Sequence, residues 1–285
     1  MSFSARPRRL SERTPMLILL PPSEGKATAG GGPPVDLEAL TFPELSTARE
    51  AVLDTLEELC SGAAETAREV LGLSAAQADA IERNRAVRTA STLRAADLYT
   101  GVLYDRLRLP ELLNSDSAAL VRESVLVFSG LWGVVGATDP LPPYRLSMGL
   151  KLPPLGALGA FWRSHLTDML TKHADDELVV DCRSAAYAAA FKPTGTIAER
   201  TVSVRVFRET MRGGTPTRSV VSHMAKAARG AVAHTLLAEH ATAQTPRDLA
   251  EALNDLGHTT ELNDPARKGR PYTLDVIVRN QRGAD

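Results

Sequence analysis

The sequence predicts an α/β protein in which helices surround a core of mixed β-sheet. Three short segments are rich in consecutive apolar residues, as expected of strands buried on both faces of a sheet: residues 17–20, 123–130 and 178–181. Between them, longer segments repeat apolar residues at helical spacing. From residue 202 the pattern becomes a strict alternation, which is typical of a strand with one more polar face.

The composition is that of a globular protein. The chain has 285 residues, 44% of them hydrophobic and 24% charged, so it can bury a substantial core. No run approaches the ~20 apolar residues that a membrane-spanning helix needs. The apolar segment of a secretory signal is also absent, so we expect a cytoplasmic protein. Residues 1–15 are expected to form a disordered arm, and residues 16–285 a single domain.

The first half of the chain is predicted to be mostly helical. A loop rich in glycine and proline covers residues 23–34, after the first strand. A helix is expected over residues 46–60, with its acidic side chains facing solvent. Residues 65–85 have the form of a helix, a glycine turn at Gly72 and a second helix, with Ser74 as a plausible N-cap.

The second half mixes helices with further strands. Residues 131–136 are expected to continue the strand at 123–130, beyond its Ser-Gly turn. The other predicted elements are a helix over 161–172, a strand at 202–207, a glycine turn at 213–214, a returning strand at 218–221, a helix over 223–240, a helix beginning at Thr245-Pro246 and ending at Leu256-Gly257, and strands at 259–262 and 273–278.

Polar residues follow two of the predicted strands directly. The first strand stops at Pro21-Pro22 and is followed by Ser23, Glu24, Gly25 and Lys26. The second strand ends at a Ser-Gly turn. Ligands of α/β proteins bind at the carboxyl edge of the sheet, so the sequence predicts a site built by these loops.

The net charge of −1 conceals an uneven distribution. Residues 36–70 carry nine acidic and two basic side chains, whereas residues 192–230 carry eight basic and two acidic ones. One face or cleft is therefore expected to be strongly positive. The predicted helix–turn–helix ends in Arg83, Arg85 and Arg88, which are candidate nucleic-acid contacts. A turn of this kind is more often a plain connection in a helical layer.

Seven motifs occur in order along almost the whole chain. They are the strand and loop at residues 16–26, Leu98-Tyr99-Thr100-Gly101, Ser129-Gly130-Leu131-Trp132-Gly133, Pro143-Tyr144-Arg145-Leu146-Ser147-Met148-Gly149, Phe161-Trp162, Phe191-Lys192-Pro193 and Ala225-Lys226-Ala227-Ala228-Arg229-Gly230. Together they resemble the YaaA family, also called the peroxide stress protein, DUF328 or UPF0246 family. The family loop reads Ser-Pro-Ala-Lys-Thr, so this chain keeps the lysine and departs from the family at Glu24.

The resemblance implies a single α/β domain, called a cannonball fold, with a mixed sheet, a positive cleft and a helix-hairpin-helix. The hairpin helices would fall on residues 65–88. Family members are associated with binding of double-stranded DNA and with lowering of free intracellular iron during peroxide stress. No settled reaction comes with the family name.

Polar residues shared with the family lie on loops beside glycines, and we expect them to converge on one pocket. The candidates for anion or substrate binding are Thr100, Ser129, Arg145, Lys192, Lys226 and Arg229, and those for catalysis are Lys26, Ser23 and Tyr99. Such a pocket would select phosphate or carboxylate. A lysine crowded by other cations has a lowered pKa and could act as a base or nucleophile. Each side chain could instead cap a turn, remain solvated or form an ordinary ion pair.

No metal site and no cofactor is predicted. The six histidines show neither HxxxH nor HExxH spacing, and Cys60 and Cys182 have the surroundings of ordinary thiols. An effect on iron would then be indirect, through DNA or metabolism.

Two functions of different classes remain open. The first is a stress-response protein that holds double-stranded DNA by its backbone phosphates in a basic cleft, without reading sequence. The alternative is an enzyme acting on a small anionic substrate, such as a nucleotide or phosphorylated metabolite, in a pocket built by Ser23, Lys26, Arg145, Lys192 and Lys226. A deep, closed pocket favours the enzyme, and a long, open groove favours DNA.

Overall fold

A computed structural model describes residues 16–28, 30–212 and 215–279. The predicted arm at residues 1–15 and the predicted glycine turn at 213–214 lie outside these ranges. The main sheet contains β1 (Leu17–Leu20), β3 (Val125–Ser129), β4 (Gly133–Gly136), β8 (Val179–Asp181), β9 (Thr201–Arg212), β10 (Thr215–Ser219), β11 (Thr260–Asn263) and β12 (Tyr272–Arg279).

The centre of this sheet is parallel and its edges are antiparallel. The strand order is β11-β12-β9-β8-β1-β3-β4, and β10 pairs with the far end of β9. Strands β12, β9, β8, β1 and β3 run parallel, whereas β11 and β4 are antiparallel to their neighbours. Every residue of β1 and β3 is buried, which agrees with their uninterrupted apolar sequences. The predicted mixed α/β fold is confirmed.

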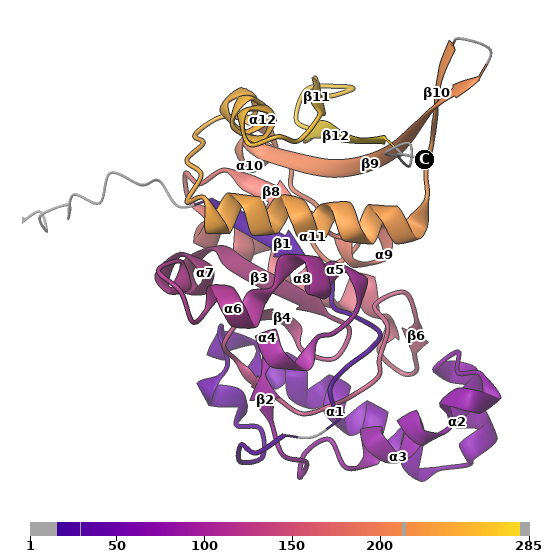
Figure 1. Cartoon of the computed structure of the whole chain (residues 1–285). Coiled ribbons are helices and arrows are strands. Elements are labelled where there is room, and N and C mark those ends of the chain that lie inside the picture. Colours follow the sequence, from indigo (N-terminus) through magenta and orange to yellow (C-terminus); the bar gives the residue numbers. More distant parts are fainter. Residues whose placement is uncertain (1–15, 29, 213–214, 280–285) are drawn as a thin grey trace, which may run out of the picture.

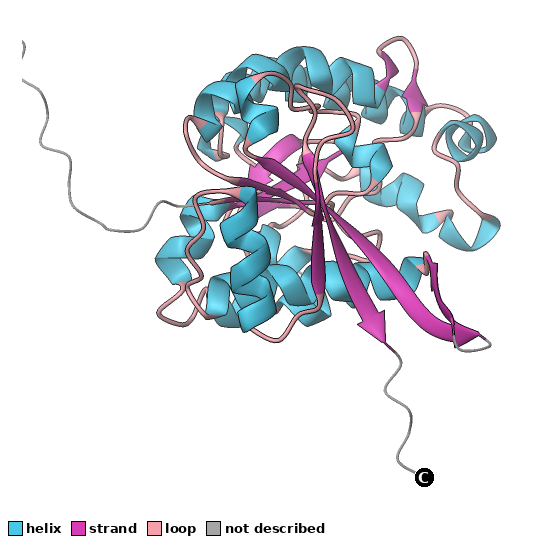
Figure 2. Cartoon of the chain, turned by 90° about the horizontal axis from the view of Figure 1, so that it is seen from above, coloured by secondary structure: helices cyan, strands magenta, loops and turns pink. Residues whose placement is uncertain are grey.

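Helices lie on both sides of the sheet, as Figure 2 shows most clearly. They are α1 (Ser46–Ser61), α2 (Ala64–Val70), α3 (Asp79–Arg85), α4 (Ala95–Leu98), α5 (Val102–Leu107), α6 (Leu109–Leu112), α7 (Ala118–Ser124), α8 (Leu158–Ala174), α9 (Ala185–Ala188), α10 (Thr196–Glu199), α11 (Ser222–Ala238) and α12 (Pro246–Asp255). Short 3-10 turns are η1 (Leu37–Ala39), η2 (Pro43–Leu45) and η3 (Ala75–Gln77). Two small ribbons pair β2 (Leu93–Arg94) with β5 (Pro140–Leu141), and β6 (Lys151–Leu152) with β7 (Gly156–Ala157).

The helix start predicted at Thr245-Pro246 is confirmed. The Thr245 hydroxyl accepts a hydrogen bond from the Asp248 N–H at 3.2 Å, and the Asp248 carboxylate accepts the Thr245 N–H at 3.0 Å. This reciprocal arrangement satisfies two backbone donors that the first helical turn leaves free. The long helices α1, α8 and α11 also lie where helical periodicity predicted them.

The expectation that residues 131–136 continue the preceding strand is wrong. The chain turns after Ser129 and returns as β4, antiparallel to β3. The turn is held by the Ser129 hydroxyl, which accepts hydrogen bonds from the N–H groups of Leu131 (3.1 Å) and Trp132 (3.0 Å). Gly133 follows in the left-handed region, with φ of 72°. The apolar sequence continues through this turn because both strands are buried.

The predicted helix–turn–helix is present in outline. Helix α2 ends before Gly72, whose φ is 61°, but the second helical segment begins as the 3-10 turn η3 before α3 starts at Asp79. At Ser74 the backbone N–H donates to the Gln77 side chain at 3.1 Å. Helix α3 packs against α1, and Figure 1 shows α2 and α3 together at one end of the molecule.

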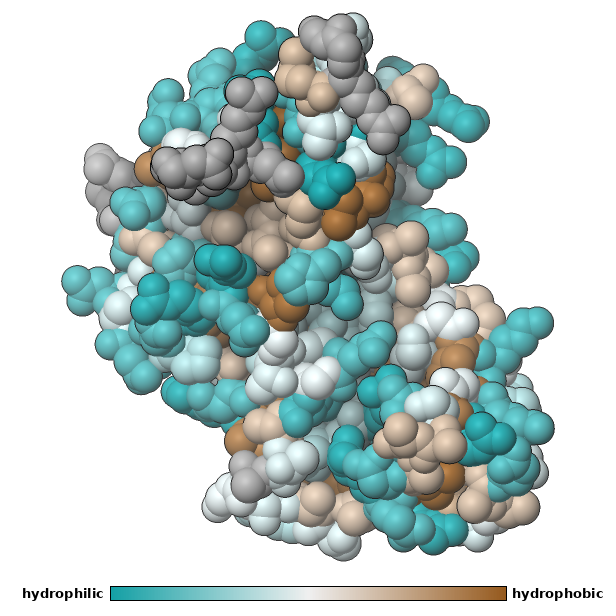
Figure 3. Space-filling model, turned by 45° about the vertical axis from the view of Figure 1, so that its right-hand side comes forward, coloured by the Kyte–Doolittle hydropathy of each residue, from teal (hydrophilic) through white to brown (hydrophobic). Residues whose placement is uncertain are grey.

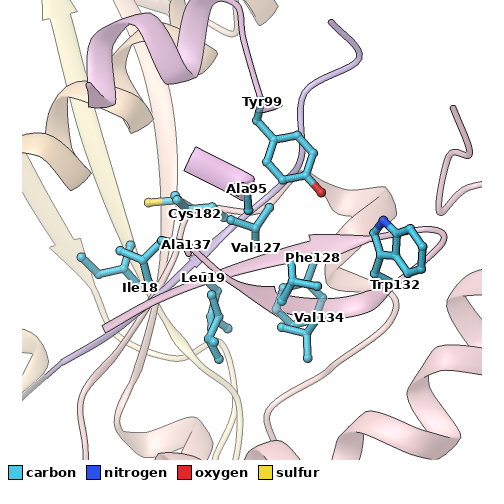
Figure 4. Close-up of a cluster of buried hydrophobic side chains, with 14 of the residues drawn as sticks. Ile18, Leu19, Ala95, Tyr99, Val127, Phe128, Trp132, Val134, Ala137 and Cys182 are labelled. Carbon is cyan, nitrogen blue, oxygen red and sulfur yellow. The ribbon is translucent and has the colours of Figure 1, made fainter. Parts of the chain in front are cut away.

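The strand order of the sheet changes direction at β1, because the strands that follow it in the chain are added first on one side of β1 and then on the other. From β1 the chain passes through the segment that contains α1 to α7 and reaches β3 on one side, and later it reaches β8 on the other side of β1. Ligands of open α/β sheets bind outside the carboxyl ends of the strands at such a point. The loops that follow β1 and β8 meet there. Figure 4 shows the apolar cluster beneath, in which Ile18, Leu19, Val127, Phe128 and Val134 are buried together.

Among the described residues, no helix is long and apolar enough to cross a membrane.

Candidate functional site

A cavity of about 870 Å³ lies at the carboxyl ends of β1 and β8. Its wall is assembled from segments far apart in sequence: residues 21–26, Leu71 and Gly72, residues 100–104, residues 145–147 and Leu150, Ser184 and Tyr187, residues 205–207, and Val220, Ser222, Ala225, Lys226 and Arg229. Figure 3 looks at this face, which is hollowed between the part that carries α2 and α3 and the part that carries β9.

The loop after β1 is fixed by hydrogen bonds to the residue that follows Tyr99. The Ser23 hydroxyl donates to the Gly25 carbonyl oxygen and accepts from the Thr100 N–H at 3.1 Å. A β-bridge also joins Lys26 to Tyr99. A Cβ on Gly25 would lie 3.1 Å from the Thr100 hydroxyl, so the close approach of the two segments favours glycine. The Ser23 hydroxyl therefore stabilises the conformation of the loop. Its proton is already donated to the Gly25 carbonyl oxygen.

Lys26 is the cation of the cavity whose pKa is strongly lowered. Its ammonium donates to the Ser23 carbonyl oxygen at 2.7 Å and lies 4.4 Å from the ring centroid of Tyr144 and 5.5 Å from that of Tyr99. The side chain is only partly exposed, toward the cavity. Removal of water around the ammonium, followed by the positive charges of Arg145 and Arg83, lowers the pKa of Lys26 to about 7.

The two tyrosines beneath Lys26 belong to a buried hydroxyl chain. The Tyr144 hydroxyl forms hydrogen bonds with the hydroxyls of Tyr99 (2.9 Å) and Ser129 (2.6 Å). Burial raises the pKa of Tyr99 and Tyr144 well above the usual tyrosine value, so both phenols stay protonated at neutral pH. Neither Tyr99 nor Ser129 lines the cavity. Their hydroxyls are hydrogen bonded to Tyr144, whose ring contacts the Lys26 ammonium, and we call these three residues the floor under Lys26.

Arg145 reaches the cavity from the loop after β5, and its backbone is clamped by Asn84 of α3. The Asn84 amide donates to the Arg145 carbonyl oxygen at 2.9 Å and accepts the Arg145 N–H at 2.8 Å. The guanidinium makes a long ion pair of 3.5 Å with Glu24, whose side chain is 80% exposed. The backbone of Arg145 is thus fixed by Asn84, while the charge of its guanidinium is only weakly neutralised by Glu24.

Helix α11 supplies two further cations to the cavity. Lys226 and Arg229 lie one turn apart on this helix, and both line the wall. The Arg229 guanidinium donates to the Val204 carbonyl oxygen of β9 at 3.1 Å and 3.3 Å, whereas Lys226 is exposed. Gly230 lets this helix pack closely on α5.

The structure brings only part of the predicted set together. Ser23, Lys26, Thr100, Arg145, Lys226 and Arg229 line one cavity. Lys192 is exposed and lies outside the residues that line it.

The candidate nucleic-acid contacts also lie outside the cavity wall. Arg83 pairs with Asp79 and Arg85 with Glu82. Arg88 contacts three carboxylates of α1, those of Glu50, Asp54 and Glu57, at 2.6–2.8 Å. The acidic segment predicted to face solvent therefore neutralises part of this basic group.

Arg205 and Tyr187 are among the residues of the wall that sequence reasoning missed. Arg205 pairs with Asp275 of β12 at 2.6 Å and 2.8 Å. The alternation of residues 202–207 placed Arg205 on the more polar face of its strand, and this was the available signal. Tyr187 had no comparable signal, because its place in the wall depends on where α9 lies in the folded chain.

Metal ligands do not gather in the described ranges, where no three His, Cys, Asp or Glu side chains are arranged to hold an ion. Cys60 and Cys182 are buried free thiols. Burial raises the pKa of Cys182 to about 12, which makes its thiolate rare.

The comparisons with known proteins agree with the motifs. The model of the peroxide stress protein YaaA family matches residues 16–262. A UPF0246 protein of Streptomyces coelicolor is 52% identical over 265 residues, which cover 92% of this chain and 98% of the relative. UPF0246 proteins of Corynebacterium efficiens and Corynebacterium glutamicum are 39% and 36% identical over 269 and 270 residues, covering 92% of this chain and all of each relative. This chain belongs to the peroxide stress protein YaaA family.

Proposed function

We propose that this protein binds a small ligand bearing a phosphate or carboxylate group in the cavity at the end of β1, within the peroxide stress response that its family name indicates. The observation that carries this proposal is the convergence of Lys26, Arg145, Lys226 and Arg229 on one cavity. Among the described residues, the only carboxylate in ion-pair contact with any of these four cations is that of Glu24.

The cations that line the cavity repel one another, and this repulsion favours the binding of an anion. Loss of water around the ammonium, followed by repulsion from Arg145 and Arg83, lowers the pKa of Lys26. An anion that enters the cavity relieves the repulsion and accepts charge-assisted hydrogen bonds. Arg145 offers a planar fork and Lys26 a point charge, the two kinds of donor that recognise phosphate.

The size and lining of the cavity also suit a small molecule. A volume of about 870 Å³ lies within the ~300–1,000 Å³ typical of ligand sites. Apolar side chains form much of the remaining wall, including Leu71, Leu150, Val206, Phe207 and Val220. These features support a ligand with an anionic end and an apolar or aromatic body, such as a nucleotide or phosphorylated metabolite.

Duplex DNA is a second candidate, favoured by one observation. The turn at Leu71 and Gly72, between the two hairpin helices, lines the same cavity as Lys26 and Arg145. A backbone phosphate placed there would contact both the turn and the cations. The carboxylate partners of Arg83, Arg85 and Arg88 weaken this candidate, because they leave less free charge on the hairpin.

Calorimetric titration with pyrophosphate, nucleotides, sugar phosphates and a DNA duplex tests both candidates. We expect a small anion to bind the wild type, and the double variant Arg145→Gln/Lys226→Gln to lose at least tenfold in affinity. Lys192→Gln removes the same kind of charge outside the cavity and should bind normally. Failure of all small anions at millimolar concentration would refute the first candidate.

The salt dependence of DNA binding separates the second candidate. Backbone recognition requires an affinity that falls steeply as salt rises. It also requires a loss of affinity on substitution of cavity cations, since Lys226 and Arg229 make no ion pair among the described residues and Arg145 makes only the long one with Glu24. DNA binding that is insensitive to salt or to Arg145→Gln/Lys226→Gln would contradict it.

A further inference from the structure

We propose that Lys26 forms a covalent imine with the carbonyl carbon of an aldehyde or ketone that also carries a phosphate or carboxylate group. The inference rests on the proposed function, because the neighbouring cations must first hold the anionic end of the ligand. It adds a reaction to what would otherwise be a binding site.

The amine of Lys26 is held by two contacts, and the residue lines the cavity. One hydrogen bond, of 2.7 Å, goes from Nζ to the Ser23 carbonyl oxygen, and the Tyr144 ring lies against Nζ on another side. The backbone of Lys26 is tied to Tyr99 by the β-bridge. Lys26 lines the cavity and is partly exposed, and from this we infer that a ligand there can approach its nitrogen. A fixed amine loses little conformational entropy on reaction.

The surroundings also favour the unprotonated form that attacks carbonyl groups. In the described ranges, no carboxylate lies within 4.0 Å of the Lys26 nitrogen. Burial, Arg145 and Arg83 lower the pKa of Lys26 to about 7, so a large fraction of the amine is neutral near pH 7. A lysine desolvated beside another cation is a known type of imine-forming nucleophile.

The other nucleophilic groups nearby are less suited to this role. Ser23 already donates its hydroxyl proton to the Gly25 carbonyl oxygen. Tyr104 lines the cavity, but its hydroxyl donates to the Pro21 carbonyl oxygen at 2.8 Å, and burial raises its pKa. Lys226 lines the cavity too, but it is exposed to solvent. Lys26 is therefore the amine that combines desolvation with access.

The reaction balances without any further reactant. The nitrogen lone pair attacks the carbonyl carbon, and the carbonyl π electrons move to oxygen, which takes up a proton. The resulting carbinolamine loses its hydroxyl group as water while nitrogen gives up its second proton. An amine and a carbonyl compound thus become an imine and one water molecule. When the imine is protonated, it withdraws electrons from the adjacent carbon, and enzymes that form imines use this effect in catalysis.

Trapping with borohydride tests the proposal directly. Pyridoxal 5′-phosphate, which carries an aldehyde and a phosphate, is incubated with the full chain, and borohydride then adds hydride to the imine carbon to give a stable secondary amine. Peptide mass spectrometry locates the modified lysine. We expect Lys26 to be labelled at least tenfold more than Lys192, and pyridoxal without phosphate to label Lys26 much less. Labelling of Lys26 no greater than that of Lys192 would overturn the proposal.

A second measurement separates failure of the imine from failure of the site. Pyrophosphate binding is measured by calorimetry for the wild type and for Lys192→Gln, which removes a lysine outside the cavity wall. If the imine is wrong and the site is right, pyrophosphate binds both proteins and no preferential adduct is trapped. If the site itself is wrong, pyrophosphate neither binds nor protects Lys26 from labelling. The proposal requires binding to both proteins, trapping at Lys26 and protection of Lys26 by pyrophosphate.

Discussion

The ammonium of Lys26 lies 4.4 Å from the ring centroid of Tyr144, whose hydroxyl is hydrogen bonded to both Tyr99 and Ser129. This contact joins four of the sequence motifs, those that contain Lys26, Tyr99, Ser129 and Tyr144. The loop after β1 supplies the cation, and three other motifs supply the buried hydroxyls that support it. An apolar substitution in this floor would therefore affect the cavity even though neither Tyr99 nor Ser129 lines it.

Anion affinity should fall as the pH rises through 7. The pKa of Lys26 is lowered to about 7, so its positive charge is present at pH 6 and mostly absent at pH 8. If binding needs the ammonium, affinity for sulfate, which does not titrate in this range, should drop about tenfold between these pH values. Calorimetric titration measures the change. Lys26→Arg should bind sulfate with little pH dependence, and an equal drop in this variant would assign the effect to another group.

Replacing Glu24 should strengthen anion binding. Its carboxylate makes the 3.5 Å ion pair with Arg145 and would compete with a ligand for that guanidinium. Because the pair is long and Glu24 is exposed, we expect Glu24→Gln to raise sulfate affinity only about 2- to 5-fold. Glu82→Gln makes the same charge change beside Arg85, outside the cavity wall, and serves as the control. Unchanged affinity in Glu24→Gln would show that Glu24 does not screen the site.

Arg49→Met should destabilise the fold strongly. The buried guanidinium of Arg49 donates to carbonyl oxygens of Thr41 (2.7 Å), Phe42 (3.2 Å), Trp132 (3.2 Å) and Val134 (3.0 Å). Methionine is a good helix former but leaves these acceptors unpaired, so we expect a loss of about 3–5 kcal/mol in the free energy of unfolding.

Urea denaturation measures this loss, and Arg88→Met provides the matched control. Arg88 makes three ion pairs, but its side chain is 31% exposed, so its substitution should cost less than about 1 kcal/mol. We infer that the hydrogen bonds of Arg49 to the four carbonyl oxygens hold the turn before α1 against β4. An equal loss of unfolding free energy in the two variants would contradict this inference.

Gly230→Ala should move the cations of α11. A Cβ at Gly230 would lie well inside van der Waals contact with the Leu103 carbonyl oxygen and 3.0 Å from the Arg106 Cβ, so α11 must shift away from α5. We expect a lower melting temperature and weaker sulfate binding, because Lys226 and Arg229 shift with the helix. Gly31→Ala is the control, since nothing in the described residues lies within 4 Å of its added Cβ. Wild-type binding by Gly230→Ala would argue against α11 as part of the site.

The fold was predictable from sequence where one local pattern decides the structure. The buried strands β1, β3 and β8 are short apolar runs, and α12 begins at a capping residue followed by proline. The reversal between β3 and β4 was not predictable in this way. Both strands are buried, so hydropathy does not change across the turn, and the serine and glycine that make it also occur inside strands.

The candidate site was predictable only where position along the chain fixes position in space. Lys26 follows a central strand, and Lys226 and Arg229 share a helix face, so all three line the cavity. Counting charges over residues 192–230 overestimated the free positive charge. Arg205 pairs with Asp275 and Arg218 with Glu261, partners supplied by β12 and β11. Sequence-local counting cannot detect such long-range pairs.

The most direct test of the anion site is anomalous diffraction from crystals soaked in tungstate, a phosphate-sized anion containing a heavy atom. The proposed function predicts an anomalous peak inside the cavity, within contact distance of Lys26 and Arg145 and displaced by added pyrophosphate. A peak that persists with pyrophosphate, or tungstate bound only outside the cavity, for example at Lys192, would contradict it.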